Sequence, residues 1–585
     1  MNPYRDLELF TEQTCNQLFH DYQPKQCLVG ELSSSALATA IALFTLEQHD
    51  PLQHKNQIEK AHQWLENSIN SDGGFGDSPE SLSNISTSLL VLASINKRAD
   101  SQLKTRLEKW LIGKIGDLNP HNIQQSILSF YGEDKTFSAP ILTMCCLAGM
   151  FDKHRDPWSL VPQLPFELAC LPHSFFKVCN LNVVSYALPA LIAVGLCRHR
   201  QKNSGLNIFR HLTKNKVLKK LQNIQPSNGG FLEATPLTGF VCMCLIRSGE
   251  IKNICVDKGV QFLVESMRGD GSWPIDSNLS TWVSSLAIKA SIPEQLTQHN
   301  VVQSDLQSFY LNQQLKTIHP YTMAEPGGWA WTDLPGGVPD ADDTAAALLV
   351  LSKIHNKNND LSTAAEHGFS WLQSLQNSDG GIPTFCKGWG KLPFDKSCPD
   401  ISAHVLEAID AWQALTNSIC DLTHFKKSLI TYLIKTQHSE GYWLPLWFGS
   451  QHHKNQQNPV YGTAQVLGVI AKSKNDLNLE PVINKAKVWL MTQQNEDGSW
   501  GLNNSGFGNI EETSLALTTL LVCDSCDTSI ISKGYDWLLE HTERGTVFNA
   551  EPIGLYFASL WYSEKKYPLC FLLRFLNQLK NSLEN

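Results

Sequence analysis

The chain has 585 residues, of which 42% are hydrophobic and 18% are charged, a composition typical of a globular protein. Its 47 basic and 56 acidic residues leave a net charge of -9, which disfavours a nucleic-acid-binding protein, because such proteins normally carry a basic surplus. A chain of this length usually divides into domains, so two or three are expected.

The N-terminal segment and the apolar stretches predict a protein that does not cross a membrane. Residues 1–21 lack a basic region followed by an apolar run, so no signal peptide is expected. The longest apolar stretch, residues 183–197, contains Pro189 and is shorter than the roughly 20 residues that a spanning helix needs. The 16 cysteines are scattered through apolar segments, which predicts buried free thiols in a reducing cytosol. Association with a membrane surface stays open.

A repeated pattern runs along the chain from residue 64 onward. Each unit has an aromatic residue or Leu, a few helical residues, often a Gln, and then a glycine turn that ends in an aromatic or apolar residue. From Gly229 onward the turns are 42, 56, 53, 61 and 57 residues apart. The units are Trp64…Phe75, Leu221…Phe231, Phe262…Trp273, Tyr310…Trp329, Trp371…Ile382, Tyr432…Trp443 and Trp489…Trp500, with Gln376, Gln437 and Gln493 as repeat glutamines.

A second element follows the glycine turns, for example at residues 86–92, 281–287, 343–349 and 512–517. It opens with Asp, Glu, Ser or Thr, which supply N-caps and acidic first-turn residues, and continues as an apolar helix. Units of two helices close into α/α toroids or stack into solenoids. The sequence therefore predicts an all-α protein with two α/α barrel (toroid) domains, at residues 25–270 and 271–585. The repeat by itself indicates structure and no chemistry.

Three carboxyl groups in residues 338–345, those of Asp340, Asp342 and Asp343, precede a predicted helix. One interpretation is an N-cap with acidic first-turn residues. The other is acid catalysis, because carboxyl groups this close do not all ionise cheaply, so the cluster holds a proton at neutral pH. A desolvated carboxylic acid is what protonation of an alkene requires, since an alkene is a very weak base.

A second polar cluster opens another predicted helix. Asp400 and His404 are four residues apart and share one face of that helix. A protonated His404 held by Asp400 would donate a hydrogen bond to the acidic cluster and increase the acidity of its proton. The alternative is an ordinary histidine in the core or on the surface.

Aromatic residues crowd the same elements. A ring face stabilises a cation by about 0.5–2 kcal/mol, so a ring-lined cavity suits a migrating carbocation. Core packing is the alternative for each individual ring. The rings are Trp329, Trp331, Phe385, Trp389, Phe394, Trp443 and Trp447, with Tyr556, Phe557, Trp561, Tyr562 and Tyr567 near the C-terminus.

Together these features resemble the squalene-hopene cyclase family, and more broadly the class II terpene cyclases. Residues 339–345, Pro-Asp-Ala-Asp-Asp-Thr-Ala, resemble the Asp-x-Asp-Asp-Thr-Ala motif of the family, and residues 400–407 resemble the segment that bears its assisting His. The repeats resemble the Gln-Trp repeats of the family, and Tyr461-Gly-Thr463 follows Trp443 and Trp447 as it does there. The resemblance covers the chain from about residue 60 to the end.

The resemblance implies that Asp342 is the proton donor, that Asp340 and Asp343 hold it in place, and that His404 and Asp400 assist. Trp331 would face an early cation. The other residues implied to contact the substrate are Trp329, Phe385, Trp443, Trp447, Tyr461, Tyr556, Phe557 and Trp561.

The resemblance also implies a substrate, a location and an assembly. The substrate would be a linear polyprene drawn from the membrane, squalene in the first place, and the product a polycyclic triterpene of the hopanoid type. The enzyme would be a homodimer, peripheral (monotopic) on the cytoplasmic, inner face of the cell membrane, with no metal or organic cofactor.

The chain also departs from the family. It is short, residues 380–394 lack the terminal aromatic of the repeat, and residues 551–562 replace a segment that contains Phe-Pro-Gly. These regions should line the far end of the cavity, where late cations form. The departures leave acid initiation intact and leave the substrate length and the product ring system open.

Other functions stay open at this stage. A protein prenyltransferase β-subunit shares the barrel but needs zinc held by Asp, Cys and His, and no clear ligand set is found. A cyclase of another polyprenoid or of a prenyl diphosphate shares the acid motif. A non-enzymatic α/α repeat scaffold predicts that Asp342 and His404 can be replaced without consequence. The single pair Cys523 and Cys526 is a weak signal for zinc or redox chemistry.

Overall fold

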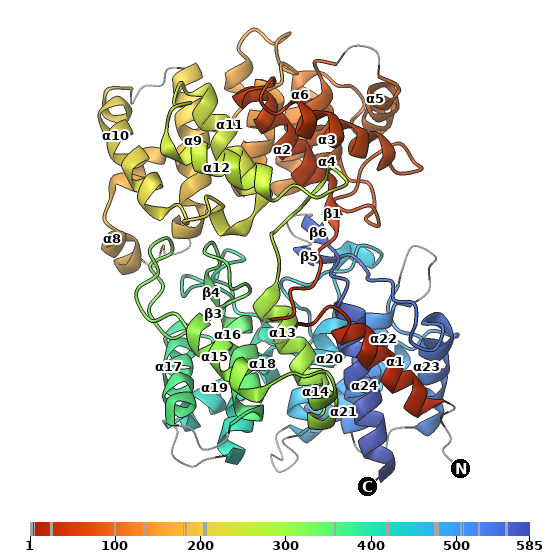
Figure 1. The fold of residues 1–585 in the computed structure, drawn as a ribbon. Coiled ribbons are helices and arrows are strands. Elements are labelled where there is room, and N and C mark those ends of the chain that lie inside the picture. Colours follow the sequence, from red (N-terminus) through yellow and green to blue (C-terminus); the bar gives the residue numbers. More distant parts are fainter. Residues whose placement is uncertain are drawn as a thin grey trace.

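The computed structural model is a mostly helical protein in which two helical domains are stacked (Figure 1). The structure describes residues 4, 6–23, 27–98, 101–132, 135–179, 181, 184–202, 207–355, 359–415, 421–472, 479–502, 506, 508–523, 527–555 and 560–584.

The first domain is a closed ring of inner helices surrounded by outer helices. Each inner helix contacts the next, and α11 returns to α2. The inner helices are α2 (Ala36–His49), α4 (Ile85–Ile95), α7 (Lys135–Leu147), α9 (Val184–Gln201) and α11 (Thr235–Arg247). The outer elements are α3 (Lys55–Asn67), α5 (Gln102–Ile115), α6 (Pro120–Tyr131), α8 (His173–Val178), α10 (Asn207–Ile224) and α12 (Ile254–Glu265), with short 3₁₀ turns at Pro157–Ser159 (η1), Phe166–Cys170 (η2) and Phe231–Glu233 (η3).

The second domain repeats this plan. Its inner helices again contact one another in sequence order, and α24 closes the ring onto α13. They are α13 (Ser280–Ala290), α16 (Ala341–Lys353), α18 (Pro399–Leu415), α20 (Pro459–Ile470), α22 (Ile510–Val522) and α24 (Tyr567–Glu584). The outer elements are α14 (Pro293–Gln298), α15 (Gln303–Gln313), α17 (Asn359–Leu375), α19 (Thr423–Thr436), α21 (Glu480–Thr492) and α23 (Thr528–His541), with a 3₁₀ turn, η4, at Lys454–Gln456.

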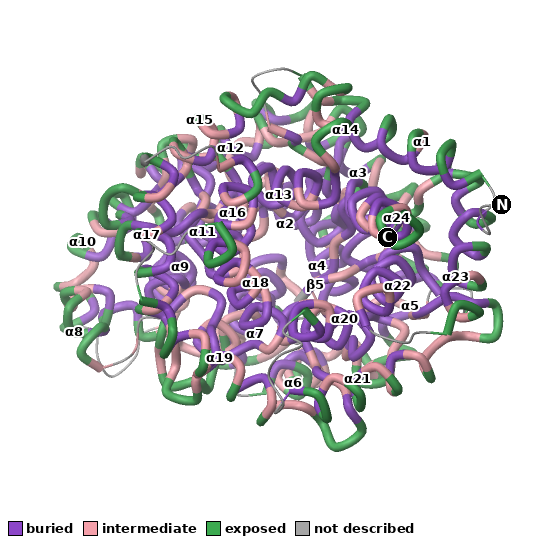
Figure 2. The backbone as a smooth tube through the Cα atoms, turned by 90° about the horizontal axis from the view of Figure 1, so that it is seen from below, coloured by how far each residue is buried: buried purple, intermediate pink, exposed green. Residues whose placement is uncertain are grey.

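Burial separates the inner from the outer helices. Viewed from below, most residues of the inner helices are buried, and the exposed stretches lie mainly at the periphery (Figure 2). In α22, for example, every residue from Ile510 to Leu520 is buried, whereas α21 buries only Val482, Ala486 and Leu490. A closed ring with apolar inner helices is an α/α barrel, so the predicted all-α fold with α/α barrels is confirmed. The boundary predicted near residue 271 stays a prediction.

The N-terminal helix packs on the second domain and not on the first. Helix α1 (Leu7–Phe19) packs against α24 as an outer helix of the second ring, so both ends of the chain lie at the bottom of the molecule in Figure 1. Its Phe10 and Leu18 belong to the same hydrophobic core as the second domain. The sequence pattern did not predict this packing, because α1 has no glycine turn.

The described residues form three short antiparallel strand pairs, the first of which joins segments far apart in the chain. They are β1 (Ser34–Ser35) with β2 (Trp273–Pro274), β3 (Trp329–Ala330) with β4 (Pro339–Asp340), and β5 (Ile553–Leu555) with β6 (Leu560–Tyr562). In the second pair, Trp329 lies opposite Asp340 and Ala330 lies opposite Pro339.

The glycine turns place the start of each inner helix. In the Trp329 turn, the backbone N–H of Trp329 donates to the hydroxyl of Thr344, 3.0 Å away, in the first turn of α16. The Nε2 group of Gln314 donates both to Gly327 O, at 2.9 Å, and to Ala364 O, at 2.8 Å. One glutamine therefore ties the turn to the neighbouring outer helix. Gln225 and Gln437 make the same pair of hydrogen bonds in their units.

One repeat glutamine was assigned wrongly from the sequence. Gln494, rather than Gln493, donates to Gly498 O and Ile530 O, at 2.8 and 3.0 Å. The Nε2 group of Gln493 donates to Thr492 at the surface. The functional spacing is four residues before the glycine, as in Gln437 and Gly441, and Gln493 lies one residue too early to reach both carbonyls.

No helix in the described part of the chain is long and apolar enough to cross a membrane.

The glycine turns predict a specific stability difference. Gly229 has a φ of 88°, and an added Cβ would overlap the carbonyl oxygen of Lys258. Gly249 in the same domain has a φ of 81°, but an added Cβ would meet no atom within 4 Å. We expect Gly249→Ala to lower the free energy of unfolding by about 1 kcal/mol through backbone strain, and Gly229→Ala by about 3 kcal/mol or more, because overlap adds to strain. Urea unfolding of both variants measures this, and equal losses would contradict the role of the turn.

Candidate functional site

Asp342 lies in the first turn of α16, at the rim of the second barrel that faces the first domain. Asp340 is the N-cap residue of this helix, and its side chain accepts a hydrogen bond from the Asp343 N–H, 2.8 Å away. The Thr344 hydroxyl donates back to Asp340 O at 2.5 Å. The Ala341 N–H donates to Thr384 O at 2.8 Å, which fixes the loop after α17 beside the helix start. The acidic residues are therefore held by the capping that the sequence predicted.

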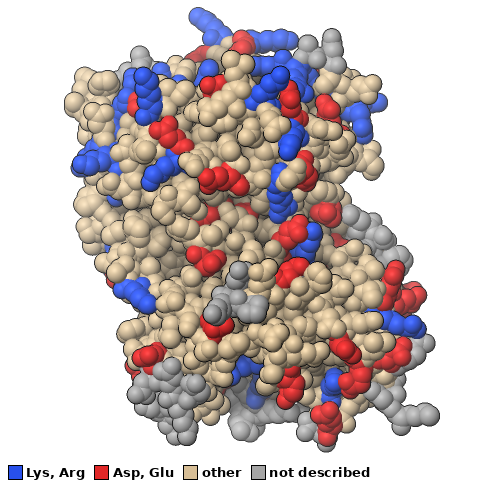
Figure 3. All heavy atoms as spheres, viewed as in Figure 1, with Lys and Arg blue, Asp and Glu red and all other residues tan. Residues whose placement is uncertain are grey.

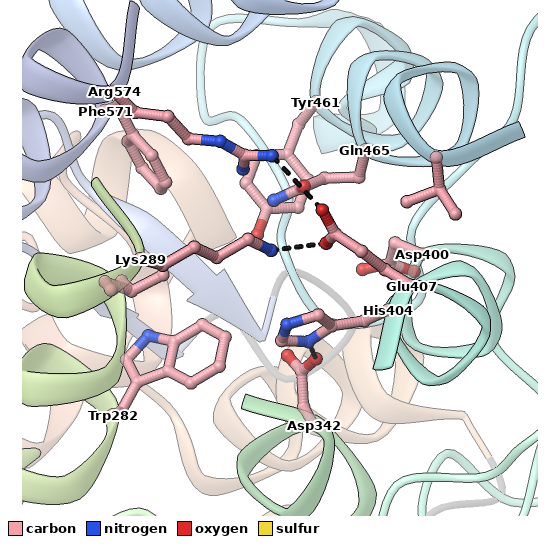
Figure 4. A pocket seen from close by; sticks show the side chains of 12 residues that line it. Trp282, Lys289, Asp342, Asp400, His404, Glu407, Tyr461, Gln465, Phe571 and Arg574 are labelled. Atoms are coloured by element: carbon pink, nitrogen blue, oxygen red, sulfur yellow. Dashed lines mark hydrogen bonds and ion pairs between the residues drawn. The ribbon is translucent and has the colours of Figure 1, made fainter. Parts of the chain in front are cut away.

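Asp342 is paired with His404. The His404 Nδ1 atom lies 2.6 Å from Asp342 Oδ1, a distance at which the ring donates a hydrogen bond to the carboxyl oxygen. The two side chains are 16% and 12% exposed. They meet because α16 packs directly against α18. His404 Nε2 is buried and has no partner in the described part of the chain, and in Figure 4 it points away from Asp342 into a cavity.

The other two carboxyl groups of the cluster retain protons to unusually high pH. Burial raises the pKa of Asp340 to about 7, although hydrogen bonds from Asp343 oppose this shift. Burial, and then the charge of Asp340, raise the pKa of Asp343 well above its usual range. Asp343 Oδ1 has no hydrogen-bond partner among the described residues. The cluster therefore holds a proton near neutral pH, as its spacing in the sequence predicted.

Asp400 has a different partner from the one expected. The sequence suggested that Asp400 holds His404, but the thiol of Cys398 donates to Asp400 Oδ1 at 2.6 Å, and His404 bonds Asp342 directly. Burial raises the pKa of Asp400 to about 7. Residues four apart share a helix face without necessarily touching, and here the neighbouring helix offers His404 a closer acceptor.

A buried charge cluster that sequence analysis missed lies behind His404. Glu407 bonds Lys289 at 2.5 Å, Lys472 at 3.0 Å and Arg574 at 3.6 Å. Burial alone would raise the pKa of Glu407, but the three cations hold it well below its usual range. Burial lowers the pKa of Lys289 to about 8. The available sequence signal was a cation among apolar residues in two helices, Lys289 in α13 and Arg574 in α24.

A cavity of about 420 Å³, its opening included, joins these groups inside the barrel. Its walls come from α13, α16, α18, α20 and α24, and Trp282 packs edge-on against His404 with ring centroids 6.0 Å apart (Figure 4). The lining residues are Trp282, Leu286, Lys289, Asp342, Asp400, His404, Glu407, Tyr461, Gln465, Val469, Phe571 and Arg574. Asp342, Asp400, His404 and Tyr461 were expected from the sequence, and the structure brings them together.

A second group of predicted residues lies where the hydrophobic cores of the two domains meet. Trp331 and Phe385 pack against both cores. The Phe385 ring lies 6.3 Å from Trp331 and 5.7 Å from Trp447, both edge-on. The carbonyl of Trp331 accepts hydrogen bonds from the N–H groups of Thr281 and Trp282, so the start of α13 positions this ring.

The remaining predicted rings have other surroundings. Trp329 and Trp443 are fully buried, and their indole N–H groups donate to the carbonyls of Tyr310 and Leu433, at 2.7 and 2.9 Å. Trp273 and Trp500 make the same bond to their own preceding helices, so this tryptophan is a structural part of the repeat and differs from the substrate-contacting position expected for Trp329 and Trp443. Trp561 is buried on β6, and its backbone N–H donates to Asp77 Oδ2 at 2.8 Å. Tyr556 and Phe557 lie outside the described residues.

Within the described residues, no group of three or more His, Cys, Asp or Glu side chains is arranged to hold a metal ion.

Comparison with known proteins finds relatives among terpene cyclases. A squalene-hopene cyclase from Bradyrhizobium diazoefficiens is 26% identical over 290 residues, which are 44% of this chain and 42% of that protein. A squalene hopane cyclase from Aspergillus fumigatus is 23% identical over 587 residues, covering 81% of this chain and 74% of that protein. The matches to the first curated relatives span less than half of their length.

A solved structure has the same fold along the whole chain. The ent-copalyl diphosphate synthase from Streptomyces platensis superimposes with a TM-score of 0.56 over 98% of this chain and 99% of its own, at 14% identity. At that identity the similarity establishes the fold alone.

Family models match both domains. Residues 30–120 match the prenyltransferase alpha-alpha toroid domain, and residues 280–581 match the squalene-hopene cyclase C-terminal domain. The second match spans more than half of the 585 residues and contains Asp342, His404 and the cavity around them. The chain therefore belongs to the squalene-hopene cyclase family.

Proposed function

We propose that this protein is a class II terpene cyclase that protonates a linear polyprene, squalene in the first place, and closes it into a polycyclic triterpene of the hopanoid type. The observation that carries the proposal is the 2.6 Å contact between His404 and Asp342 within a cluster of buried carboxyl groups that opens into a cavity. Asp340 and Asp343, whose pKa values burial raises, flank Asp342 at this helix start, a setting that suits protonation of a weak base.

Asp342 is the proton donor in this proposal. His404 donates a hydrogen bond to Asp342 Oδ1, which stabilises the carboxylate that remains after the proton leaves from the other oxygen. The proton forms a bond to the terminal alkene carbon, the alkene electron pair supplies that bond, and the neighbouring carbon becomes the cation that the next alkene attacks. Asp340 and Asp343 position the start of the helix. Because burial raises the pKa values of both, they add little negative charge beside Asp342 at neutral pH.

The aromatic residues stabilise the cations in this proposal. Trp331, Phe385, Trp447 and Tyr461 are the predicted rings whose surroundings support such a role, because they lie in the cavity wall or at the junction of the two cores. Each ring face contributes about 0.5–2 kcal/mol to a nearby cation, and more when water is excluded.

A membrane surface is the proposed source of the substrate. Apolar side chains are exposed on η2, α8 and α10 of the first domain. Figures 1 and 2 place α8 and α10 at the same edge of the molecule, and η2 contacts α10. Helix α10 also carries five basic and no acidic residues, although the chain as a whole has a net charge of -9. In the view of Figure 3, Lys and Arg gather on the upper half of the molecule, which contains this domain. The exposed apolar residues are Leu168, Phe175, Val178, Ile208, Phe209 and Leu212.

Apolar side chains beside basic ones fit the interface of an anionic bilayer, where the former enter the headgroup region and the latter meet lipid phosphates. We therefore propose peripheral binding at the cytoplasmic face of the cell membrane, in the homodimeric form that the family resemblance implies.

The acid assignment is tested on three variants. Asp342→Asn keeps the shape and removes the transferable proton, so turnover of squalene in detergent should fall by at least about 100-fold with little change in Tm. The loss of turnover in His404→Ala should be severe but less complete than in Asp342→Asn, because the ring does not give its proton to the alkene. Asp527→Asn, a helix N-cap in the same domain, is the matched control and should keep its turnover. Parallel incubation with a prenyl diphosphate identifies the substrate class, and a folded Asp342→Asn enzyme with near-normal turnover would exclude the mechanism.

Replacing Trp331 should affect turnover and products, whereas replacing Trp329 should affect stability. Trp331→Ala removes a ring proposed to face an early cation, so turnover should fall about tenfold and less-cyclised products should appear. Trp329→Ala removes a fully buried ring and its bond to Tyr310 O, so the free energy of unfolding should fall by about 3–5 kcal/mol. Product analysis and Tm on both variants measure this. Unchanged products and rate for Trp331→Ala would assign that ring to packing.

The membrane assignment is tested with vesicles that contain anionic lipid. Val178, Ile208 and Leu212 are 84%, 81% and 74% exposed, and replacing all three with Ser should weaken vesicle binding at least about tenfold. Leu52→Ser is the control, because Leu52 is 86% exposed outside this patch. Binding should resist a high-salt wash, because salt screens only the charged contacts. Equal binding by the triple variant and the control would refute this surface.

A further inference from the structure

A second inner helix begins like the helix that carries Asp342. Helix α22 opens with Asn509-Ile-Glu511-Glu512-Thr513, which aligns residue by residue with the start of α16, residues 340–344. The N-cap Asn509 accepts from the Glu512 N–H at 2.7 Å, as Asp340 does from Asp343. The Thr513 hydroxyl accepts from the Trp500 N–H at 2.9 Å, as Thr344 does from Trp329. Glu511 therefore occupies the repeat position of Asp342.

Glu511 lines a cavity of its own, next to the cavity of Asp342. This second cavity has about 410 Å³, its opening included, and Glu551, His452 and Tyr567 are among its lining residues. Tyr461 and Phe571 line both cavities, so the two spaces are separated by little more than these rings.

The Glu511 carboxyl group has a free acceptor oxygen. The side chain is 7% exposed, its Oε1 accepts from the Glu551 N–H at 3.0 Å, and its buried Oε2 has no partner among the described residues. Glu512 differs, because its Oε1 accepts from Asn458 and Asn509, both at 3.2 Å. A buried oxygen without a protein partner is costly, and it is left able to accept a hydrogen bond or a proton from a water, an ion or a ligand in the cavity.

Among the residues that the structure describes, no Lys or Arg lines this second cavity. Burial, and then the charge of Glu551, raise the pKa of Glu511 to about 8, and burial raises the pKa of Glu551 to about 7. Glu512, which also lines this cavity, has its pKa raised by burial to about 7. The carboxyl groups of this cavity therefore titrate near neutral pH, so that both a proton and an acceptor oxygen are available there. An uncompensated carboxyl pair also attracts a cation and favours its deprotonation.

We infer that Glu511 is the proton acceptor that ends the reaction. A C–H bond next to the last carbocation breaks, its electron pair forms the product alkene, and the proton moves to Oε2 of Glu511. The substrate thus gains a proton from Asp342 and loses one to Glu511, the equivalent position of another repeat. The inference rests on the proposed cyclase function and assigns the product an alkene rather than an alcohol.

The test compares products rather than rates. Glu511→Gln keeps the shape and removes the base, so substrate consumption should stay within about threefold of the native enzyme while the main alkene falls at least about fivefold relative to isomeric alkenes and alcohols. Glu511→Asp, which withdraws the carboxyl group by one methylene, should shift the products in the same direction. Glu512→Gln is the matched control, and its product ratio should be that of the native enzyme.

The outcomes separate this inference from the proposed function. An unchanged product ratio in Glu511→Gln, or an equal shift in Glu512→Gln, overturns the role of Glu511. Loss of all turnover in a folded Glu511→Gln variant also overturns it, because initiation would then depend on this residue. Failure of the native enzyme to cyclise any polyprene refutes the proposed function instead.

Discussion

The hydrogen bond between a turn N–H and the hydroxyl in the first turn of the next inner helix is the contact on which the rest of the structure depends. It joins Phe75 to Ser88 and Trp500 to Thr513, and in both units it holds the start of an inner helix against the preceding glycine turn. The repeat glutamine then ties that turn to the next outer helix. Because inner helices start at one rim, their N-caps and first-turn side chains gather there, and the acidic residues of different repeats come within one barrel mouth.

Burial determines which carboxyl groups at this rim keep a proton near neutral pH. A carboxyl group at a helix N-terminus is ordinarily ionised, because the helix dipole and the free N–H groups stabilise its charge. Here desolvation outweighs those effects for Asp340, Asp343 and Asp400, whose pKa values are all raised. The cations around Glu407 produce the opposite result a short distance along α18, and this carboxyl group stays ionised despite its burial. Protonated and ionised acids therefore coexist inside one barrel, and the position of Lys289, Lys472 and Arg574 decides which is which.

Repetition allows one local structure to take different roles. Asp342 and Glu511 each lie two residues after a side-chain N-cap and two residues before a threonine. Asp342 nevertheless has a histidine partner, whereas Glu511 has a second acidic residue, Glu551, beside it. A hydrogen-bond donor increases the tendency of an acid to release its proton, whereas a neighbouring carboxyl group increases the tendency to keep one. The same first-turn position thus suits a donor in one repeat and an acceptor in another.

The sequence by itself determined the helical repeat, the N-caps and the acidic cluster, because turns, caps and adjacent carboxyl groups depend on residues close together in the chain. It also singled out His404 as a hydrogen-bond donor to the acidic cluster, and in the structure His404 bonds Asp342 of that cluster from another helix. The support expected from Asp400 takes another form, because Asp400 Oδ1 accepts from the Cys398 thiol. The tertiary structure decided which tryptophans are structural, as for Trp329 and Trp443, because an indole that donates to the preceding helix looks the same in the sequence as one that faces a cavity. It also decided the cluster around Glu407 and the docking of α1 on α24, since these contacts join segments that are far apart in the chain and have no local pattern.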